Sequence, residues 1–181
     1  MSWTAPLTAV ATASLSAAQW NASVRDNLLE TAPAKATAAG QVFVATAANA
    51  IAARTPSSNL ITTIETTTST TSGVLPTAGP SVSVVTGSSA FVAFGAWMRN
   101  NTSGDGCQMY IVVSGATTVA EAAENSAIAD AESASNVYRS HDRFVHFTGL
   151  TPGTNVFTAK YQAVGGGTAT FGYRRLFVFP L

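Results

Sequence analysis

Charge is scarce in this sequence. Asp, Glu, Lys and Arg make up only 10% of its 181 residues, whereas about 25% is usual in soluble domains. Nine positive side chains balance nine negative ones, so the chain has no basic field to attract nucleic acid or an anionic membrane, and neither is an expected partner. A neutral, charge-poor surface also suits a free soluble monomer badly. The composition therefore indicates that other protein chains cover much of the surface.

Cysteine, a leader peptide and long apolar runs are missing or nearly so. Cys107 is the single cysteine, which excludes an internal disulfide and fits synthesis in a reducing compartment. The first ten residues carry no positive charge ahead of an apolar core, so we expect no signal peptide. No apolar run approaches the ~20 residues that a membrane-spanning helix needs.

The signals of a helix are concentrated in one stretch, Ser14–Leu29, with the sequence SLSAAQWNASVRDNLL. Ser16 is a good N-cap, and Gln19 stands three residues later, at the capping-box position. Pro33 should end the helix, because the residue before a proline is pushed out of the α region. A helix of this length is only marginally stable alone in water.

An apolar stripe runs along this expected helix. Trp20, Val24 and Leu28 recur every four residues and so share one face, and Leu15 is placed to form a hydrophobic staple with Trp20. A disordered tail is the alternative for residues 1–40, but disordered tails rarely carry so many capping and stop signals. The stripe therefore needs a partner surface.

A β-hairpin is expected next, in Gly40–Arg54. Val42 and Val44 fall on one face of its first strand and Phe43 on the other. Asn49 marks the turn, since Asn tolerates the left-handed conformation. An isolated hairpin is at best marginally stable, so this segment also needs a neighbour.

The rest of the chain, residues 59–181, has the pattern of an antiparallel β-sandwich. Short segments of strand character are separated by turn-forming clusters, which is typical of a sandwich or jelly roll. The expected strands are Leu60–Thr67, Ser81–Thr86, Ala90–Arg99, Gln108–Val113, Arg143–Leu150, Asn155–Val164 and Ala169–Phe179. Residues 116–136 are expected to form a surface loop with a short strand near Ala127–Ala131.

The predicted organisation is that of a mainly β protein with three parts. Residues 1–40 form an extended arm with one short helix. Residues 41–58 form a hairpin collar and a linker. Residues 59–181 form an antiparallel, jelly-roll-like β-sandwich that serves as the head domain.

Two of the expected strands, Ala90–Arg99 and Ala169–Phe179, are apolar on both faces. A strand of this kind is buried on both faces, whereas the outer face of a two-layer sandwich normally meets water. Another subunit is the expected cover, and a β-bulge that shifts the register is the alternative. The expected interface residues are Phe91, Phe94, Trp97, Phe171, Tyr173, Phe177 and Phe179.

No arrangement of residues predicts an active site. His141 and His146 are five apart, so on a strand they face opposite sides and do not share a metal ion. Gly165–Gly167 joins two strands without a following helix or Lys, so it is not a phosphate-binding loop. The loop carboxylates lack the EF-hand pattern, and Cys107 is best explained as a small buried hydrophobe. We expect no catalytic residue, no cofactor, no metal and no enzyme activity.

Both ends of the chain resemble virion proteins of tailed phages that infect actinobacteria. Those proteins share a W-x-x-P start, an A-x-W-N-x-x-V-R-D-N-L helix and a hairpin similar to GQVFVATAANAIAAR. The residues that carry the resemblance are Trp3, Pro6, Ala18, Trp20, Asn21, Val24, Arg25, Asp26, Asn27, Leu28, Gly40, Ala45, Thr46, Ala47, Asn49, Ala50 and Arg54. The C-terminal sequence GLTPGTNVFTAKYQAVGGGTATFGYRRLFVFPL is similar to the closing strands of their jelly-roll heads.

The resemblance implies a structural protein of the virion, assembled in the cytoplasm of the bacterial host. It implies a homotrimeric capsid decoration protein, or head fibre, whose jelly roll forms an outward knob. The residues expected to attach it to the major capsid protein are Trp3, Leu15, Trp20, Val24 and Leu28. The alternative is a minor tail or tail-fibre protein whose jelly-roll tip binds a host cell-surface carbohydrate.

Overall fold

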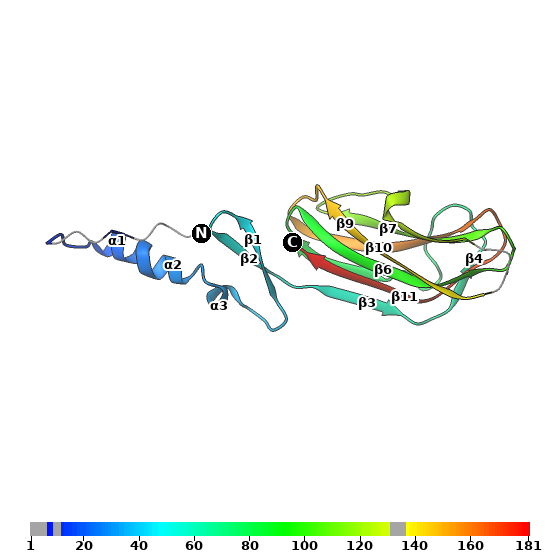
Figure 1. Cartoon of the computed structure of the whole chain (residues 1–181), viewed down its shortest axis with the longest axis horizontal. Coiled ribbons are helices and arrows are strands. Elements are labelled where there is room, and N and C mark those ends of the chain that lie inside the picture. Colours follow the sequence, from blue (N-terminus) through cyan, green and yellow to red (C-terminus); the bar gives the residue numbers. More distant parts are fainter. Residues whose placement is uncertain (1–6, 9–11, 131–136) are drawn as a thin grey trace. The chain divides into compact units, whose positions relative to one another are not determined.

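The computed structural model describes residues 7–8, 12–130 and 137–181 of the chain. The chain divides into two compact units, which are unit 1 (Met1–Thr55) and unit 2 (Pro56–Leu181). Unit 1 contains short helices and a hairpin, and unit 2 contains two β-sheets (Figure 1). None of the described helices is long and apolar enough to cross a membrane.

The predicted helix of unit 1 forms, and its capping box is confirmed. The Ser16 hydroxyl accepts a hydrogen bond from the Gln19 backbone N–H (3.2 Å), and the Gln19 side chain accepts one from the Ser16 N–H (2.9 Å). The helical residues run without a break through α1 (Ala17–Trp20), the π-helical turn η1 (Asn21–Arg25) and α2 (Asp26–Leu28).

The π turn affects the apolar stripe. In an α-helix each residue advances by about 100°, so side chains four apart drift by about 40° around the axis. A π turn is wider, with hydrogen bonds between residues five apart, and the Asp26 N–H donates to the Asn21 carbonyl in this way. Each residue of the turn therefore advances less, which reduces the drift between Trp20 and Leu28.

Pro33 does not simply end the helical part of the chain, as the sequence predicted. Thr31 is extended, and a second short helix, α3 (Ala32–Lys35), begins directly after it. Proline fits at this position because its φ angle is already helical and its missing N–H is not needed in a first turn. Strands β1 (Val42–Ala47) and β2 (Ala50–Arg54) then form the predicted hairpin, and Asn49 adopts the left-handed conformation with a φ of 57°.

Unit 2 is a sandwich of two antiparallel sheets (Figure 1). Its strands are β3 (Ser57–Ile61), β4 (Glu65–Thr67), β5 (Ser81–Thr86), β6 (Ser89–Asn100), β7 (Gly106–Gly115), β8 (Ser126–Asp130), β9 (Arg139–Thr148), β10 (Gly153–Val164) and β11 (Ala169–Pro180). The five-stranded sheet has the order β3-β11-β6-β9, with β4 also on β11, and the four-stranded sheet has the order β5-β10-β7-β8. The chain changes sheet at most of its connections, which is the jelly-roll arrangement. The predicted fold class is confirmed.

The core lies between the two sheets. The predicted alternation along β10 is observed, because Phe157, Ala159, Tyr161 and Ala163 are all fully buried and the residues between them are partly exposed. Cys107 is buried in the same core, as expected, and this burial raises the pKa of its thiol to about 11.

A β-bulge in β11 changes which face of this strand points into the core. Tyr173 and Arg174 together stand opposite a single residue of β6, Ala96, so the register shifts by one residue at this point. Phe171 before the bulge and Leu176 after it consequently both face the core and are fully buried. The bulge, which was the alternative explanation from the sequence, is therefore present in β11. Beyond it, the outward Phe177 and Phe179 still leave the strand apolar on both faces.

The same bulge divides the strand predicted at Leu60–Thr67 into two. Strand β3 pairs with β11 beyond the bulge and β4 pairs with it before the bulge. Between them, the Ile64 side chain lies over Gly172, where a Cβ atom would be only 2.9 Å from Ile64 Cγ1. In the stretch 116–136, the structure contains η2 (Ala123–Asn125) and β8, which matches the predicted short strand except for Ala131, outside the described residues.

Candidate functional site

The outer face of the five-stranded sheet carries a concentration of partly exposed aromatic side chains. On β6 the residues alternate, so that Val92, Phe94 and Met98 point into the core while Phe91 and Trp97 point outward. The aromatic residues on the outer face are Phe91, Trp97, Tyr138, Phe144, Tyr173, Phe177 and Phe179. The four-stranded sheet differs, because β10 presents mainly Thr158, Lys160 and Gln162 on its outer side. The aromatic outer face is therefore the surface of unit 2 that most needs a partner.

Two of the predicted interface residues do not lie on this face. Phe94 is 1% exposed and Phe171 is fully buried, and both belong to the core. The prediction was wrong for Phe94 because the core side of β6 was not identified, and for Phe171 because the bulge reverses the facing of β11. Neither side chain is available to another molecule.

Sequence patterns missed one aromatic residue that dominates the face. Phe144 is 65% exposed and lies in β9 between the charged or polar residues of the RSHDRFVHFT segment. Alternation along β9 places Phe144 and His146 outward and Phe147 inward, and this pattern could have predicted that Phe144 is exposed. It also separates His141 from His146, which lie on opposite faces as predicted.

The outward aromatic residues form two clusters at opposite ends of the sheet. In the phenylalanine cluster (Phe91, Phe144, Phe177 and Phe179, with His146), Phe91 stacks on Phe144 with ring centroids 5.3 Å apart and on His146 at 4.6 Å. Phe179 pairs with Phe91 across the strands, and Phe177 lies two residues away on β11. Only hydrocarbon rings and one imidazole meet there, so contact with water is unfavourable.

The second cluster, the tryptophan cluster, consists of Trp97, Tyr138, Tyr173 and Arg99. The Trp97 ring is 4.5 Å from Tyr173 and 6.4 Å from Tyr138 between centroids. The Arg99 guanidinium lies over the Tyr138 ring, 4.5 Å from its centroid. Unlike the phenylalanine cluster, this one combines aromatic faces with hydroxyl, indole N–H and guanidinium groups.

A groove of about 440 Å³ separates the two clusters, with Leu60, Ala93, Asp142, Arg175 and Phe177 among its lining residues. The groove exists because β6 carries two small residues on this part of the sheet, Ala93 and Gly95. The Asp142 carboxylate folds over this glycine and accepts a hydrogen bond from the Ser140 hydroxyl (3.1 Å). The groove therefore has one negative and one positive side chain, and its walls combine apolar side chains with the polar Ser58 and Asn59.

Unit 1 exposes most of its apolar side chains. Of the predicted attachment residues, Leu15, Trp20 and Leu28 are 52%, 56% and 59% exposed, and Val24 is half-buried. Trp3 lies outside the described residues. The two buried residues in the described part of unit 1, Asn27 and Glu30, are both polar. The described part of this unit consequently has no apolar core of its own.

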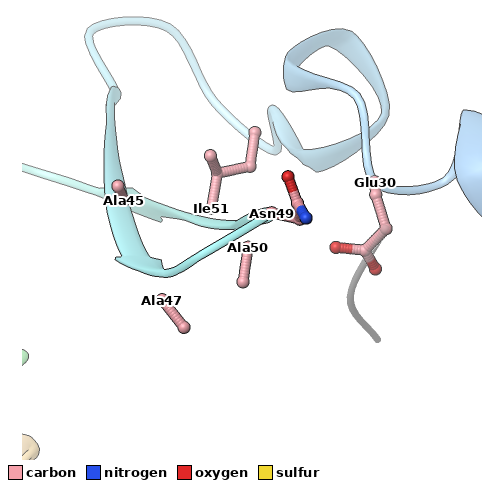
Figure 2. Close-up of a pocket in the computed structure, with 6 residues that line it drawn as sticks. All are labelled: Glu30, Ala45, Ala47, Asn49, Ala50 and Ile51. Carbon is pink, nitrogen blue, oxygen red and sulfur yellow. The ribbon is translucent and has the colours of Figure 1, made fainter. Parts of the chain in front are cut away.

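Unit 1 also has a hollow beside its hairpin. The hollow has a volume of about 310 Å³ and is lined by Ala45, Ala47, Asn49, Ala50, Ile51 and Glu30. Figure 2 shows the Glu30 carboxylate opposite the hairpin turn that carries Asn49. Lys35 Nζ is 2.9 Å from Glu30 Oε2, and this interaction lowers the pKa of the Glu30 carboxyl.

Metal-ligating side chains are not clustered in the part of the chain that the structure describes. No group of three or more His, Cys, Asp or Glu side chains in that part of the chain is placed to hold a metal ion. The candidate functional surfaces are therefore the aromatic outer face of unit 2 and the exposed apolar side chains of unit 1.

The protein is therefore a jelly-roll protein whose chain also contains a helix–hairpin unit. No protein-family model matches the chain, and no curated protein matches it. Among solved structures, Eiger TNF from S. frugiperda is 7% identical with a TM-score of 0.48, over 71% of this chain and 92% of that one. The VP2 subviral particle of infectious bursal disease virus is 12% identical with a TM-score of 0.49, over 76% of this chain and 37% of that one. The structure of T=1 particles derived from the same virus is 14% identical with a TM-score of 0.47, over 76% of this chain and 35% of that one. These likenesses do not extend to function.

Proposed function

We propose that this chain is a structural protein of a phage virion, of the capsid decoration or head-fibre type. Unit 1 attaches it to the major capsid protein, and unit 2 associates with two further copies through the phenylalanine cluster. The protein is assembled into the virion in the cytoplasm of the bacterial host. The resemblance of the helix and hairpin sequences to phage virion proteins supports this proposal.

The observation that carries the proposal is the lack of an apolar core in the described part of unit 1. Both buried residues there, Asn27 and Glu30, are polar, while Trp20 and Leu28 are more than half exposed. Folding must offset the entropy of ordering each residue, about 1–2 kcal/mol for the backbone alone. A unit that buries so little apolar surface by itself gains the missing free energy by binding another surface.

Apolar contact supplies enough free energy for this attachment. Fully burying one large apolar side chain contributes about 1.5–3 kcal/mol, and Leu15, Trp20 and Leu28 each begin more than half exposed. The hollow beside the hairpin, where three of the six lining residues are alanines, provides space for a side chain of the capsid surface. In a trimer three such arms bind together, which multiplies the effect by avidity.

We expect the purified protein to be a homotrimer in solution. The phenylalanine cluster is apolar and exposed, and Phe144 and Phe177 are 65% and 42% exposed in the single chain. Light scattering at micromolar concentration should therefore give three times the 18.5 kDa mass of one chain. Phe144→Ala should shift the protein toward monomer, whereas Val85→Ala, an exposed apolar residue on the other sheet, should not. A monodisperse monomer of the unmodified chain would contradict the trimer.

We also expect Trp20→Ala to release the protein from its particle while unit 2 stays folded. Trp20 lies in unit 1 and contributes nothing to the buried residues of the sandwich. The measurement is the amount of protein that pellets with particles after washing, with near-ultraviolet circular dichroism of the free protein as a check on unit 2. Val85→Ala is the matched control, because Val85 and Trp20 are both 56% exposed. Retention equal to that of the unmodified protein would rule out the stripe as the attachment surface.

Attachment should be insensitive to salt. The charged residues in the described part of the arm pair with each other, Arg25 with Asp26 at 2.8 Å and Lys35 with Glu30 at 2.9 Å. Exposed charge pairs are screened beyond about 8–10 Å at physiological salt, whereas apolar burial is weakened by guanidinium but not by NaCl of moderate concentration. Particles are pelleted at increasing concentrations of NaCl and, separately, of guanidinium. The protein should be released from the particles in guanidinium only. Release by moderate NaCl would mean that charges carry the attachment.

A further inference from the structure

The tryptophan cluster has a different chemistry from the phenylalanine cluster, which suits it to a different partner. Trp97, Tyr138 and Tyr173 are 44%, 38% and 37% exposed, so each ring keeps a free surface and a polar group. A buried subunit interface gains nothing from hydroxyl and guanidinium groups that lose their water without finding partners. Such groups are useful where a polar ligand replaces that water.

The backbone is strained to place one of these rings. Tyr173 has a φ of 49°, a conformation that is a genuine outlier for a bulky residue. It occupies the β-bulge of β11, and bulges re-aim side chains next to functional sites. The result is that the Tyr173 ring lies 4.5 Å from Trp97, at an interplanar angle of 53°. A glycine would hold this bulge without strain, and the Tyr173 ring is 37% exposed, so the core does not require a tyrosine here.

Arg99 adds hydrogen-bond donors beside the rings. Its guanidinium lies over Tyr138, and among the described residues it makes no ion pair and no hydrogen bond to a side chain. A guanidinium fixed over a ring presents its remaining N–H groups in one plane, which matches hydroxyl and carboxylate oxygens. The cluster thus combines three apolar ring faces with donors and acceptors at their edges.

The geometry points to a saccharide-binding site at the tryptophan cluster, with the sugar rings lying on Trp97 and Tyr173 and their hydroxyl groups bonding to Arg99 and the tyrosine hydroxyls. A pyranose ring has an apolar face of C–H groups and an equatorial edge of hydroxyls, so it needs an aromatic surface bordered by polar groups. The Trp97 ring is inclined by 53° to Tyr173 and by 48° to Tyr138. Surfaces inclined in this way fit successive units of an oligosaccharide better than one flat ligand.

Other ligands fit this cluster less well. Single-stranded nucleic acid also stacks on aromatic rings, but it requires a positive groove for its backbone, and this chain has no net charge. A proline-rich peptide docks in aromatic-lined grooves, and it is the competing ligand in the test below. The saccharide is favoured because polar groups border all three rings.

The site is separate from the surfaces used in the proposed function and does not depend on it. Trp97 lies six residues beyond Phe91 on β6, which is ~20 Å at 3.3–3.4 Å per residue. The chain enters the sandwich at the other end of the sheet, where Ser57 pairs with Val178 beside the phenylalanine cluster. A trimer formed through that cluster leaves the tryptophan cluster accessible.

A single intrinsic fluorophore can report on this site in the full chain. The sequence contains three tryptophans, so the double substitution Trp3→Phe and Trp20→Phe leaves Trp97 alone. This protein is first applied to an array of neutral and uronic-acid-containing oligosaccharides, together with a proline-rich decapeptide. Each retained oligosaccharide is then titrated in solution while the Trp97 emission is followed. We expect a saturable blue shift, because stacking removes water from the indole.

Substitutions then assign the binding to the cluster. In the unmodified background, Trp97→Ala and Tyr173→Gly should each weaken calorimetric binding at least about tenfold. Tyr173→Gly relieves the positive φ, so it should unfold no more easily than the unmodified chain, which separates lost binding from lost folding. Val85→Ala is the control, because Val85 is exposed on the four-stranded sheet, away from both clusters, and it should leave binding unchanged.

The proposal is overturned if no oligosaccharide on the array is retained, if the decapeptide binds instead, or if binding survives Trp97→Ala. It is also overturned if Val85→Ala weakens binding as strongly as Trp97→Ala does. Loss of the trimer in light scattering with intact saccharide binding would instead count against the proposed self-association, while the saccharide site would stand.

Discussion

Arg174→Met should lower the free energy of unfolding by about 3–5 kcal/mol, the usual cost of removing one partner from a buried ion pair. Arg174 is fully buried, and its Nη2 donates to Glu65 Oε2 at 2.7 Å. Its Nη1 donates to the Thr77 carbonyl oxygen at 3.0 Å. The substitution leaves the Glu65 carboxylate, whose side chain is only 12% exposed, without its cation.

The effect is large because this pair ties three parts of the sandwich together. Arg174 belongs to the bulge of β11, Glu65 to β4, and Thr77 to the segment before β5. The N–H and the hydroxyl of Thr77 also donate hydrogen bonds to Glu65 Oε1, at 2.9 and 2.8 Å. The guanidinium also lies 5.4 Å from the centroid of the buried Tyr161 ring. Without the pair, β4 and the Thr77 segment lose their attachment to the bulge.

Chemical denaturation at one fixed protein concentration measures the change, because self-association makes stability depend on concentration. The double variant Glu65→Leu/Arg174→Met is the control: it leaves no unpaired charge and should recover part of the loss. Equal stability of Arg174→Met and the unmodified chain would show that the pair contributes nothing. A double variant as unstable as the sum of its single variants would show that the two residues act independently.

The pair also predicts a pH dependence. Burial raises the pKa of the Glu65 carboxyl, but hydrogen bonds from Thr77 and the charge of Arg174 outweigh this effect and hold the pKa below its usual value. A lowered pKa in the folded state adds stability above the unfolded pKa of about 4.3, and this stability is lost as the pH falls through the folded value. The stability difference between the unmodified chain and Glu65→Gln should therefore shrink below about pH 4.

Phe94→Ala and Phe177→Ala should separate folding from self-association. Phe94 is 1% exposed in the core and pairs with Leu176, and Phe177, the next residue of β11, is 42% exposed on the outer face. Phe94→Ala should cost about 3–5 kcal/mol of stability, as expected when a large core side chain is removed. Phe177→Ala removes little buried surface from the single chain and should weaken the trimer instead.

Denaturation at low protein concentration and light scattering at high concentration measure these two effects. The core assignment fails if Phe94→Ala is as stable as the unmodified chain. The interface assignment of the phenylalanine cluster fails if Phe177→Ala remains fully trimeric at concentrations near the dissociation constant. Because the two residues are of the same type and in adjacent strands, differences in chemistry do not confuse the comparison.

Local signals were sufficient to predict most elements of the chain. The capping box at Ser16, the left-handed turn at Asn49 and the alternation along β10 are observed as expected. Each of these features depends on contacts or conformations within a few residues, which the sequence states directly. The fold class followed from the same signals, because many short alternating segments between turn residues can bury their apolar faces only as packed antiparallel sheets.

The facing of β11 was decided by the tertiary structure. The sequence signal for the bulge is weak: Gly172 is an isolated glycine within a strand, which is compatible with a bulge, but the positive φ falls on Tyr173 and not on the glycine. The shift depends on how β11 pairs with β6 and on the burial of Arg174 against Glu65, which is 109 residues away in the chain. Long-range pairing of this kind leaves no local pattern.

The sequence by itself determined that this protein has a β-sandwich, a capped helix and a hairpin, and that more aromatic surface exists than one sandwich can bury. The tertiary structure decided which aromatic residues are left outside. Phe94 and Phe171 fill the core, whereas Phe144 and Trp97 remain on the surface. The physical reason is that alternation along a strand fixes which residues share a face, while only packing between the two sheets, and the one-residue shift at the bulge, fixes which face is inside.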